Sequence, residues 1–332
     1  MTSIKDVADA AGVSTATVSR VLANKPHVRP EVRAHVLAVV EDLNYRPNRV
    51  ARSLRVQKSK IIGLIVADIQ NPFFTGVSRA VEDMAYKHGL NVFLCNTDEN
   101  PDKETSYLEL MRDENVAGLI LSPTRQTADS FADAVNLDLP IVVIDRRVRG
   151  VEVDSILLDN VEAAYRLVSH LIDDGHQRIG AMFGINSTTG RERREGFVQA
   201  LKDHNLKPSP ELVSFVEARE EEGYQTTLRL LRLPEPPEAI FTSNALLSAG
   251  AFRALRQSKL AMPGQIAFAS FDETTWTSLV TPGVTVIEQP TYEIGQTAAE
   301  LLLKRLAEPD RPTREVILKG KLIVRQSCGC QG

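Results

Sequence analysis

The chain has 332 residues, of which 43% are hydrophobic and 25% charged, and its formal net charge at pH 7 is −4. This composition is typical of globular proteins and excludes a disordered or collagen-like chain. The longest apolar run, residues 61–67, is far shorter than the roughly 18 residues expected of a membrane-spanning helix. At about 150 residues per domain, the length predicts two folding units.

The chain start and the cysteines indicate where the protein works. Asp6 lies among the first residues and no apolar segment follows it, so we expect no signal peptide and a cytoplasmic protein. The cysteines Cys95, Cys328 and Cys330 are too few and too scattered for a disulfide framework. We expect Cys328 and Cys330 to be reduced thiols, because no second pair of metal ligands accompanies them in the sequence. A metal or redox role for this pair is the alternative, and we expect no metal site and no cofactor.

The net charge is divided unevenly along the chain. Residues 1–60 contain 11 Lys and Arg against 5 Asp and Glu, whereas the remaining residues contain 28 against 38. Such asymmetry indicates that the basic segment binds nucleic acid or another anionic partner. A solvated basic tail is the alternative, and the helical pattern of this segment argues against it.

The first predicted helix begins after Ser3, and its apolar face is formed by Ile4, Val7, Ala8 and Ala11. Ser3 and Asp6 match a capping box, and Gly12 can adopt the left-handed conformation that ends a helix. A second helix starts at once, with Ser14 as its N-cap and an inward face formed by Val18, Val21 and Leu22. Two short helices joined by so tight a turn predict a helix-turn-helix.

A third helix is predicted from Pro30, and it ends before Arg46-Pro47 because a residue preceding proline avoids the helical region. The outer face of the second helix is formed by Thr15, Ala16, Ser19 and Arg20. In a helix-turn-helix this helix enters the major groove, where an arginine can donate two hydrogen bonds to guanine. We therefore expect Arg20 to read a base. An exposed polar helix face is the alternative.

Residues 48–55 form a short basic segment without a full apolar face. An isolated helix of this length is marginal in water, so the segment would fold only on DNA. Leu54 lies between Arg52 and Arg55, which suits an apolar wedge at a kinked minor-groove step. A solvated linker is an equally open interpretation.

From Lys60 onward, short apolar runs alternate with longer stretches of helical period. The predicted strands are Ile61–Ala67, Asn91–Cys95, Gly118–Leu121, Ile141–Ile144, Ile179–Phe183, Ala239–Thr242 and Ile266–Phe271. Near-continuous apolar strands separated by helices predict parallel sheets buried on both faces, and the length favours two lobes.

Polar residues follow five of these strands, among them Asp68, Asp145, Thr189, Asn244 and Asp272. Ligands of open α/β sheets bind outside the carboxyl ends of the strands, so the five ends together predict a polar small-molecule cleft. Any single one of these residues could instead be a helix N-cap.

Several segments together resemble the signature of the lactose/galactose repressor (LacI/GalR) family of bacterial transcriptional regulators. They are Ile4-Lys5-Asp6-Val7-Ala8, Gly12-Val13-Ser14, Thr17-Val18-Ser19-Arg20-Val21-Leu22, Tyr45-Arg46-Pro47-Asn48 and Ala51-Arg52-Ser53-Leu54. The resemblance continues to the C-terminus. It implies an α/β protein with an N-terminal all-α helix-turn-helix headpiece and a two-lobed, parallel-sheet domain like that of the type I periplasmic binding proteins.

The resemblance also implies domain boundaries. They are a headpiece over residues 1–47, a hinge helix or linker over 48–59, and an effector-binding and dimerisation domain over 60–332. One lobe would comprise about 60–160 plus 291–320, and the other 161–290 plus the C-terminal end, with three crossings near residues 160, 290 and 320.

The resemblance assigns site residues at both ends of the chain. The implied DNA-binding residues are Ser14, Thr15, Ala16, Thr17, Arg20, Asn24, Tyr45, Asn48, Ala51, Arg52, Leu54 and Arg55. The implied effector-binding residues are Asn71, Phe73, Phe74, Arg146, Thr189, Arg193, Asn244 and Asp272. A guanidinium fork and a carboxylate can each grip adjacent hydroxyls. Phe74 could stack on a sugar ring or belong to the core.

Two departures from the family pattern bear on the effector. Ala245 and Ala218 stand where relatives place a polar residue and an aromatic residue, respectively. The loops expected to form the cleft are rich in arginine, at positions Arg146, Arg147, Arg191, Arg193 and Arg194. One hypothesis is an effector carrying negative charge, such as a sugar acid or sugar phosphate. The alternative is that these arginines pair on the surface with Glu192 and Glu195.

The sequence contains no phosphate-binding glycine loop, no zinc-protease motif and no nucleophile elbow, and we expect no catalysis. The resemblance implies a repressor that binds a palindromic operator as a homodimer under the control of a small, carbohydrate-like effector. A solute-binding or sugar-handling protein of similar lobed fold without DNA function is the alternative, and the basic helix-turn-helix argues against it.

Overall fold

The computed structural model describes residues 3–22, 28–43, 45, 59–131, 139–185 and 187–329. The chain divides into two compact units, Met1–Ser59 and Lys60–Gly332. Most of the predicted 48–59 segment lies outside the described residues. Among the helices that are described, none is both long and apolar enough to cross a membrane.

The first unit contains three helices, α1 (Ile4–Ala10), α2 (Thr15–Leu22) and α3 (Pro30–Asp42). The capping box is present, because Ser3 N donates to Asp6 Oδ2 at 2.8 Å and Asp6 N donates to Ser3 Oγ at 3.3 Å. Gly12 has a φ of +62°, which confirms the predicted left-handed turn between α1 and α2. The core is formed by Val7, Ala8, Ala11, Val18, Val21 and Val36.

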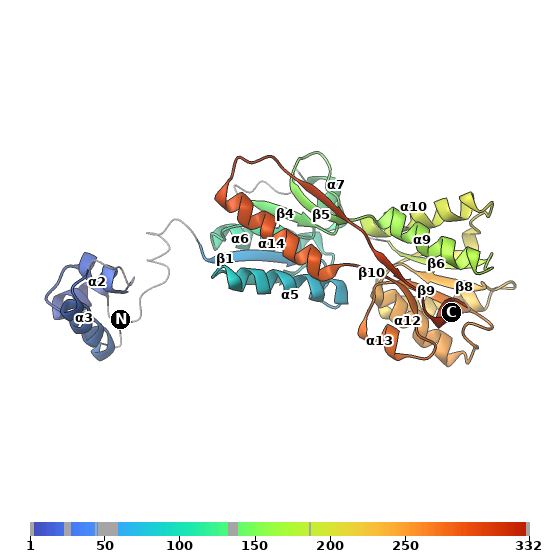
Figure 1. The fold of residues 1–332 in the computed structure, drawn as a ribbon, viewed down its shortest axis with the longest axis horizontal. Coiled ribbons are helices and arrows are strands. Elements are labelled where there is room, and N and C mark those ends of the chain that lie inside the picture. Colours follow the sequence, from blue (N-terminus) through green and yellow to red (C-terminus); the bar gives the residue numbers. More distant parts are fainter. Residues whose placement is uncertain are drawn as a thin grey trace. The chain divides into compact units, whose positions relative to one another are not determined.

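The second unit contains two six-stranded sheets (Figure 1). The first has the order β11-β5-β4-β3-β1-β2, and its neighbouring strands all run parallel. Its strands are β1 (Ile61–Val66), β2 (Asn91–Asn96), β3 (Leu119–Leu121), β4 (Ile141–Ile144), β5 (Asp154–Leu158) and β11 (Glu315–Leu318). Its helices are α5 (Pro72–Lys87), α6 (Pro101–Asp113), α7 (Arg125–Asp129) and α14 (Thr291–Ala307).

The second sheet has the order β12-β10-β9-β8-β6-β7 and is parallel except for the pairing of β12 with β10. Its strands are β6 (Ile179–Gly184), β7 (Val213–Val216), β8 (Ala239–Thr242), β9 (Ala267–Phe271), β10 (Thr285–Glu288) and β12 (Lys321–Ile323). Its helices are α9 (Asn160–Asp173), α10 (Thr188–Asp203), α11 (Glu220–Leu231), α12 (Ala245–Gln257) and α13 (Thr275–Leu279), with short 3₁₀ turns η1 (Pro210–Leu212) and η2 (Gln326–Cys328). The predicted α/β class is confirmed.

Helices cover both faces of each sheet, which explains why the central strands are apolar on both sides. Helices α5 and α14 pack together over one face of the first sheet, and α6 contributes to the core on the other. In the second lobe, α9 and α10 form one layer and α11 and α12 form the other. Each helix layer thus packs on one face of a sheet, and the second unit has four buried apolar clusters, two in each lobe.

The chain passes between the two sheets three times, and Figure 1 shows the connecting segments running from one lobe to the other. The crossings join β5 to α9, β10 to α14, and β11 to β12. All seven predicted strands are present within a residue or so of their expected bounds. Five further strands, β5, β7, β10, β11 and β12, were not predicted.

Candidate functional site

A cavity of about 800 Å³ lies in the second unit. Residues from both sheets line it, and most of them directly follow the carboxyl end of a strand, as Asp68 follows β1, Asp145 follows β4 and Asp272 follows β9. This is the edge at which open α/β sheets hold their ligands. All eight residues predicted to bind an effector line this cavity: Asn71, Phe73, Phe74, Arg146, Thr189, Arg193, Asn244 and Asp272.

Arg193 of α10 is 4% exposed, and its guanidinium is held from several sides. Nε donates to Asn160 Oδ1 at 2.8 Å, and Nη1 donates to the carbonyl of Ser243 at 2.5 Å. The guanidinium carbon lies 4.0 Å from the centre of the Phe271 ring. Burial lowers the pKa of Arg193, whereas the charges of Asp272 and Asp145 oppose that shift. Neither fixed hydrogen bond uses Nη2, which leaves this donor for the cavity.

Asp272 is fixed just as firmly at the end of β9. Its Oδ2 accepts from the backbone N–H of Ala245 at 2.8 Å, and its Oδ1 accepts from Gln289 Nε2 at 2.5 Å. The residue has a φ of +75°, an uncommon conformation for a residue other than glycine. Each carboxylate oxygen has a second lone pair, so Asp272 can still accept hydrogen bonds from a ligand.

Arg146 is 3% exposed and is already engaged by protein groups. It forms a bidentate ion pair with Glu99 and also donates to the carbonyl of Pro123 at 2.9 Å. Its Nε lies 3.4 Å from Asp145 Oδ2. A guanidinium neutralised in this way is a structural group of the cavity wall more than a receptor for an anion.

Two of the predicted polar residues cap helices and also line the cavity. Asn71 Oδ1 accepts from Phe73 N at 3.1 Å at the start of α5, and Asn244 Oδ1 accepts from Leu247 N at 2.8 Å at the start of α12. The helix-cap alternative therefore holds for both residues, and each side-chain NH₂ group remains a donor at the cavity wall. Phe74 likewise does both, since it belongs to the apolar core and lines the cavity, with its ring 5.0 Å from that of Phe73.

Two carboxylates of the first lobe retain open acceptor capacity. Burial raises the pKa of Asp145 to about 6, and the charges of Arg146 and Arg193 only partly counter it. Burial also raises the pKa of Asp68, and the neighbouring Asp98 and Glu99 add to that shift. On the first-lobe wall, acidic residues outnumber basic ones, because Asp68, Asp98, Glu99 and Asp145 stand against Arg146.

The arginine-rich loops do not converge on the cavity as the anionic-effector hypothesis requires. Of the five arginines, only Arg146 and Arg193 line it. Arg147 pairs with Glu315 at 2.5 Å, Arg191 with Asp129 at 3.4 Å, and Arg194 lies 5.5 Å from the centre of the Phe215 ring. In the alternative these arginines pair with Glu192 and Glu195, and Glu192 accepts a hydrogen bond from Asn160 Nδ2 at 2.8 Å. The sequence argument for a negatively charged effector therefore rests on Arg146 and Arg193 alone.

The sequence did not assign several residues of the cavity wall. Asp98, Glu99 and Asn100 follow the predicted strand β2, so the rule applied to the other strand ends would have found them. Glu217 and Arg219 follow β7, and Gln289 follows β10, two strands that were not predicted.

The first unit presents the predicted DNA-reading face on α2. Ser14, Thr15, Ala16 and Arg20 are exposed, whereas Val18 and Val21 point into the core. Ser14 caps the helix, because Thr17 N donates to its Oγ at 3.2 Å, and Thr17 is half-buried beside it. Tyr45 is half-buried and packs against the headpiece core. The other predicted DNA-binding residues lie outside the described residues: Asn24, Asn48, Ala51, Arg52, Leu54 and Arg55.

Two family models match the chain. Residues 3–48 match the bacterial regulatory proteins of the lacI family, and residues 59–325 match the periplasmic binding proteins and sugar-binding domain of the LacI family. The chain is 33% identical to the HTH-type transcriptional repressor PurR of Mannheimia succiniciproducens over 329 residues, which is 98% of each chain. A protein with the periplasmic-type domain alone would match the second model only.

Solved structures of similar proteins carry both DNA and sugar ligands. The lac repressor dimer bound to operator and the anti-inducer ONPF is 26% identical, with a TM-score of 0.85 over 98% of this chain and 99% of that one. The complex of the transcriptional regulator CelR with cellobiose is 26% identical, with a TM-score of 0.72 over 98% of this chain and 100% of that one.

Proposed function

The chain belongs to the LacI family of bacterial regulatory proteins and is a DNA-binding transcriptional repressor rather than an enzyme, and from this premise we propose that a neutral, sugar-like effector controls it from the described cavity. The observation that carries the proposal is the wall chemistry of the cavity. Asp68 and Asp145 accept hydrogen bonds on one side, and Arg193 donates on the other. Hydroxyl groups both donate and accept, so a polyol satisfies both sides.

An anionic effector fits this wall poorly. A carboxylate or phosphate entering the cavity would approach Asp68 and Asp145, whose raised pKa values already reflect burial away from water. Repulsion between like charges grows in such partly buried surroundings because solvent screens them less. Three arginines line the cavity, and carboxylates already face each of them. Glu99 holds Arg146, Glu217 lies 3.0 Å from Arg219, and the charges of Asp272 and Asp145 act on Arg193. Neutral sugars are therefore the favoured ligand class.

Ligand binding by full-length protein tests this assignment. We expect neutral pentoses, hexoses or their disaccharides to raise the melting temperature, and sugar acids and sugar phosphates of matched size to leave it unchanged. Calorimetry on the stabilising sugar then gives the affinity. Tight binding of a sugar acid or phosphate without binding of any neutral sugar would refute the proposed ligand class.

Two neighbouring arginines provide a matched pair of variants. Arg193→Ala removes the buried donor from the cavity, and we expect sugar binding to fall by at least tenfold. A hydrogen bond to a charged group contributes about 1.5–3 kcal/mol, and the substitution also leaves Asn160 Oδ1 without this donor. Arg194→Ala changes an exposed residue that does not line the cavity, and its sugar affinity should stay within a factor of two. Equal sugar affinities of the two variants would show that Arg193 does not contribute to sugar binding.

We also propose that the repressor acts in the cytoplasm as a homodimer on a near-palindromic operator. Support comes from the DNA-bound dimer of the similar lac repressor and from exposed apolar side chains on the first lobe. Phe93 and Leu94 of the edge strand β2 are 39% and 45% exposed, and Tyr86 of α5 is 79% exposed. Exposed apolar groups on an edge strand are typical of a subunit contact. A two-fold dimer places two α2 helices on the two half-sites.

A gel shift on DNA from the region upstream of the protein's own coding sequence tests the operator assignment, with and without the stabilising sugar. We expect a protein–DNA complex at nanomolar protein concentration whose affinity falls as the salt concentration rises. The sugar should either strengthen this complex or dissociate it. Absence of any sequence-preferred complex across genomic fragments would contradict it.

A further inference from the structure

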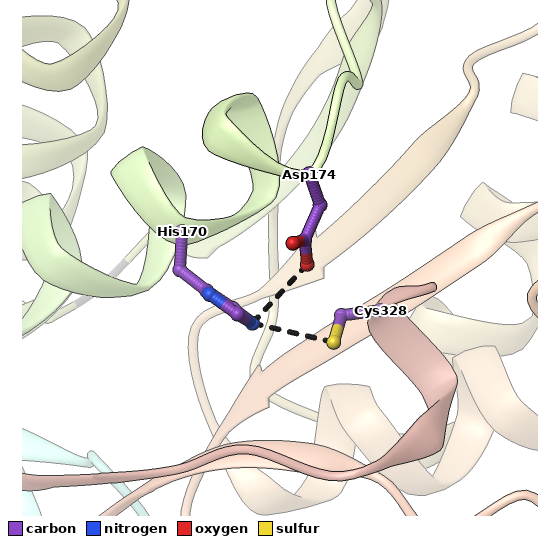
Figure 2. A group of neighbouring side chains, drawn as sticks. All are labelled: His170, Asp174 and Cys328. Atoms are coloured by element: carbon purple, nitrogen blue, oxygen red, sulfur yellow. Dashed lines mark hydrogen bonds and ion pairs between the residues drawn. The ribbon is translucent and has the colours of Figure 1, made fainter. Parts of the chain in front are cut away.

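A second cluster of reactive side chains lies in the second lobe, formed by His170 and Asp174 at the end of α9 and by Cys328 in η2 (Figure 2). His170 Nε2 lies 3.2 Å from Cys328 Sγ and 3.3 Å from Asp174 Oδ2. The three possible ligand atoms all lie within 4.8 Å of one another. None of the three residues lines the effector cavity.

Hydrogen bonds among the three side chains do not satisfy all of their polar atoms. A single Nε2–H of His170 can serve only one of its two neighbours at a time. Asp174 Oδ2 is buried and has no hydrogen-bond partner within the described part of the chain. Apart from its ion-pair contact with His170, this buried carboxylate oxygen has no donor, which is costly, and a bound cation would remove that cost.

The position of Asp174 adds a second argument for a cation. Asp173 and Asp174 stand at the C-terminal end of α9, where the helix dipole is negative and disfavours acidic groups. Asp173 has a partner, because its Oδ1 lies 3.4 Å from His204 Nε2. Asp174 faces His170 and the Cys328 sulfur instead.

From these observations we propose that His170, Asp174 and Cys328 form a binding site for a thiophilic divalent cation such as Zn²⁺. Zinc bonds of about 2.0 Å to nitrogen or oxygen and about 2.3 Å to sulfur put tetrahedral ligand atoms about 3.3–3.5 Å apart, close to the separations from His170 Nε2. Thiolate with imidazole selects zinc over magnesium or calcium. His170 and Asp174 are each 18% exposed, so a water molecule can reach a fourth position.

Neighbouring contacts already hold the ligands in place. His176 Nε2 donates to the backbone carbonyl of Cys328 at 2.7 Å, and Ser327 Oγ accepts from Thr285 N at 2.8 Å while donating to the carbonyl of Phe268 at 2.5 Å. Cys328 Sγ donates to the carbonyl of Arg325 at 3.1 Å, a bond that the thiol gives up on becoming a thiolate ligand. Such outer contacts orient metal ligands in known sites. The cation would tie the C-terminal turn η2 to α9.

The sequence could not reveal this site. The Cys328-Gly329-Cys330 segment has no second ligand pair near it in the chain, so its spacing predicts no metal site. The fold supplies His170 and Asp174 from a helix more than 150 positions away. A sequence spacing rule finds only ligands that are close in the chain.

Titration of metal-free full-length protein with Co²⁺ tests the proposal, since cobalt occupies zinc sites and a thiolate ligand gives it an intense charge-transfer band. We expect one equivalent of Co²⁺ to produce that band and Zn²⁺ to displace it. Cys328→Ser should abolish the band, and Asp174→Asn and His170→Gln should each weaken Co²⁺ binding at least tenfold. Circular dichroism and operator binding show whether each variant is folded.

Two control variants make the outcome decisive. Cys95→Ser changes a buried cysteine of the first lobe, and His204→Gln changes a histidine that pairs with Asp173, so both should retain full Co²⁺ binding. Absence of a charge-transfer band in the wild-type protein overturns the proposal, and so does a band that persists in Cys328→Ser. Neither readout depends on a sugar or on DNA, so the metal site and the proposed effector are tested separately.

Discussion

Asp145 combines a cavity position with an unusual electrostatic environment. It follows β4 with a φ of +68°, and burial raises its pKa to about 6. An aspartate with a raised pKa in the folded state favours its neutral form there, so the folded protein gains stability from it at low pH. That contribution is complete below the ordinary pKa of 3.8 and is lost as the pH rises through about 6.

Asp145→Asn should therefore stabilise the protein at neutral pH. Relative to wild type, we expect the free energy of unfolding of the variant to increase as the pH rises from 4 to 7, by about 2–3 kcal/mol in total, and to change little above that. Asparagine also tolerates the left-handed backbone conformation. Urea denaturation at a series of pH values measures the difference, with the exposed substitution Asp310→Asn as control. A difference that does not vary with pH would contradict the electrostatic explanation.

Among the headpiece residues, we expect Arg20 to contribute most to the recognition of DNA bases. It is exposed near the end of α2, and a bidentate contact with guanine would contribute about 1–3 kcal/mol of discrimination. Arg20→Ala should relax the base preference at one position of each half-site while leaving the rest of the operator pattern unchanged. Selection of binding sites from a random DNA library measures this. An operator preference identical to that of wild type would exclude Arg20 from base recognition.

At the scale of elements, helix packing depends on a few close approaches. Gly250 of α12 faces α11, and a Cβ built on it would lie 1.8 Å from the carbonyl oxygen of Glu220. Gly250→Ala must therefore separate the two helices, and overpacking of this kind typically costs about 1–3 kcal/mol. Gly264→Ala is the matched control, because its nearest neighbour would be Ala261 Cβ at 3.9 Å. Denaturation of the two variants should show a loss only for Gly250→Ala, and equal stability would refute the packing argument.

Continuous apolar runs identified six of the eight central strands, all but β5 and β10, and only β2 among the four edge strands. In β7 the exposure varies along the strand, with Phe215 45% exposed, because the strand lies at the edge of its sheet. Strand β10 is central, yet only Val286 and Ile287 form its apolar run, between Thr285 and Glu288. Short strands of this kind are defined by pairing with neighbouring strands in the sheet. The local sequence does not contain that information.

Because local sequence reveals only some of the strands, it also reveals only some of the cavity residues that follow strands. Residues following recognised strands, such as Asn244 and Asp272, could be assigned because strand ends and the family resemblance agreed on them. Gln289 follows a strand that was not recognised, and its bond to Asp272 joins residues from two different strand ends. The pairing of Arg146 with Glu99 was also beyond reach, since it connects residues 47 positions apart and changes the charge of the cavity wall.

At the scale of the whole molecule, the proposed dimer rests on the edge strand β2. Leu94→Asp places a charge on an exposed apolar residue there, so we expect the variant to sediment as a monomer at micromolar concentration and to bind operator far more weakly. Ile317→Asp is the control, because Ile317 is 50% exposed on β11 at the opposite edge of the same sheet. A dimeric Leu94→Asp variant would show that the subunits meet elsewhere.

The three crossings between the lobes limit how the second unit can respond to a ligand. Because three chain segments join the lobes, we expect the lobes to rotate about these segments more readily than they slide or separate. Gly320 lies in the third segment, where a Cβ would come within 2.7 Å of Ile287 Cγ2. We therefore expect a side chain at position 320 to shift the equilibrium between open and closed lobes without contacting the bound molecule. Such a substitution would change how the regulator responds to its effector.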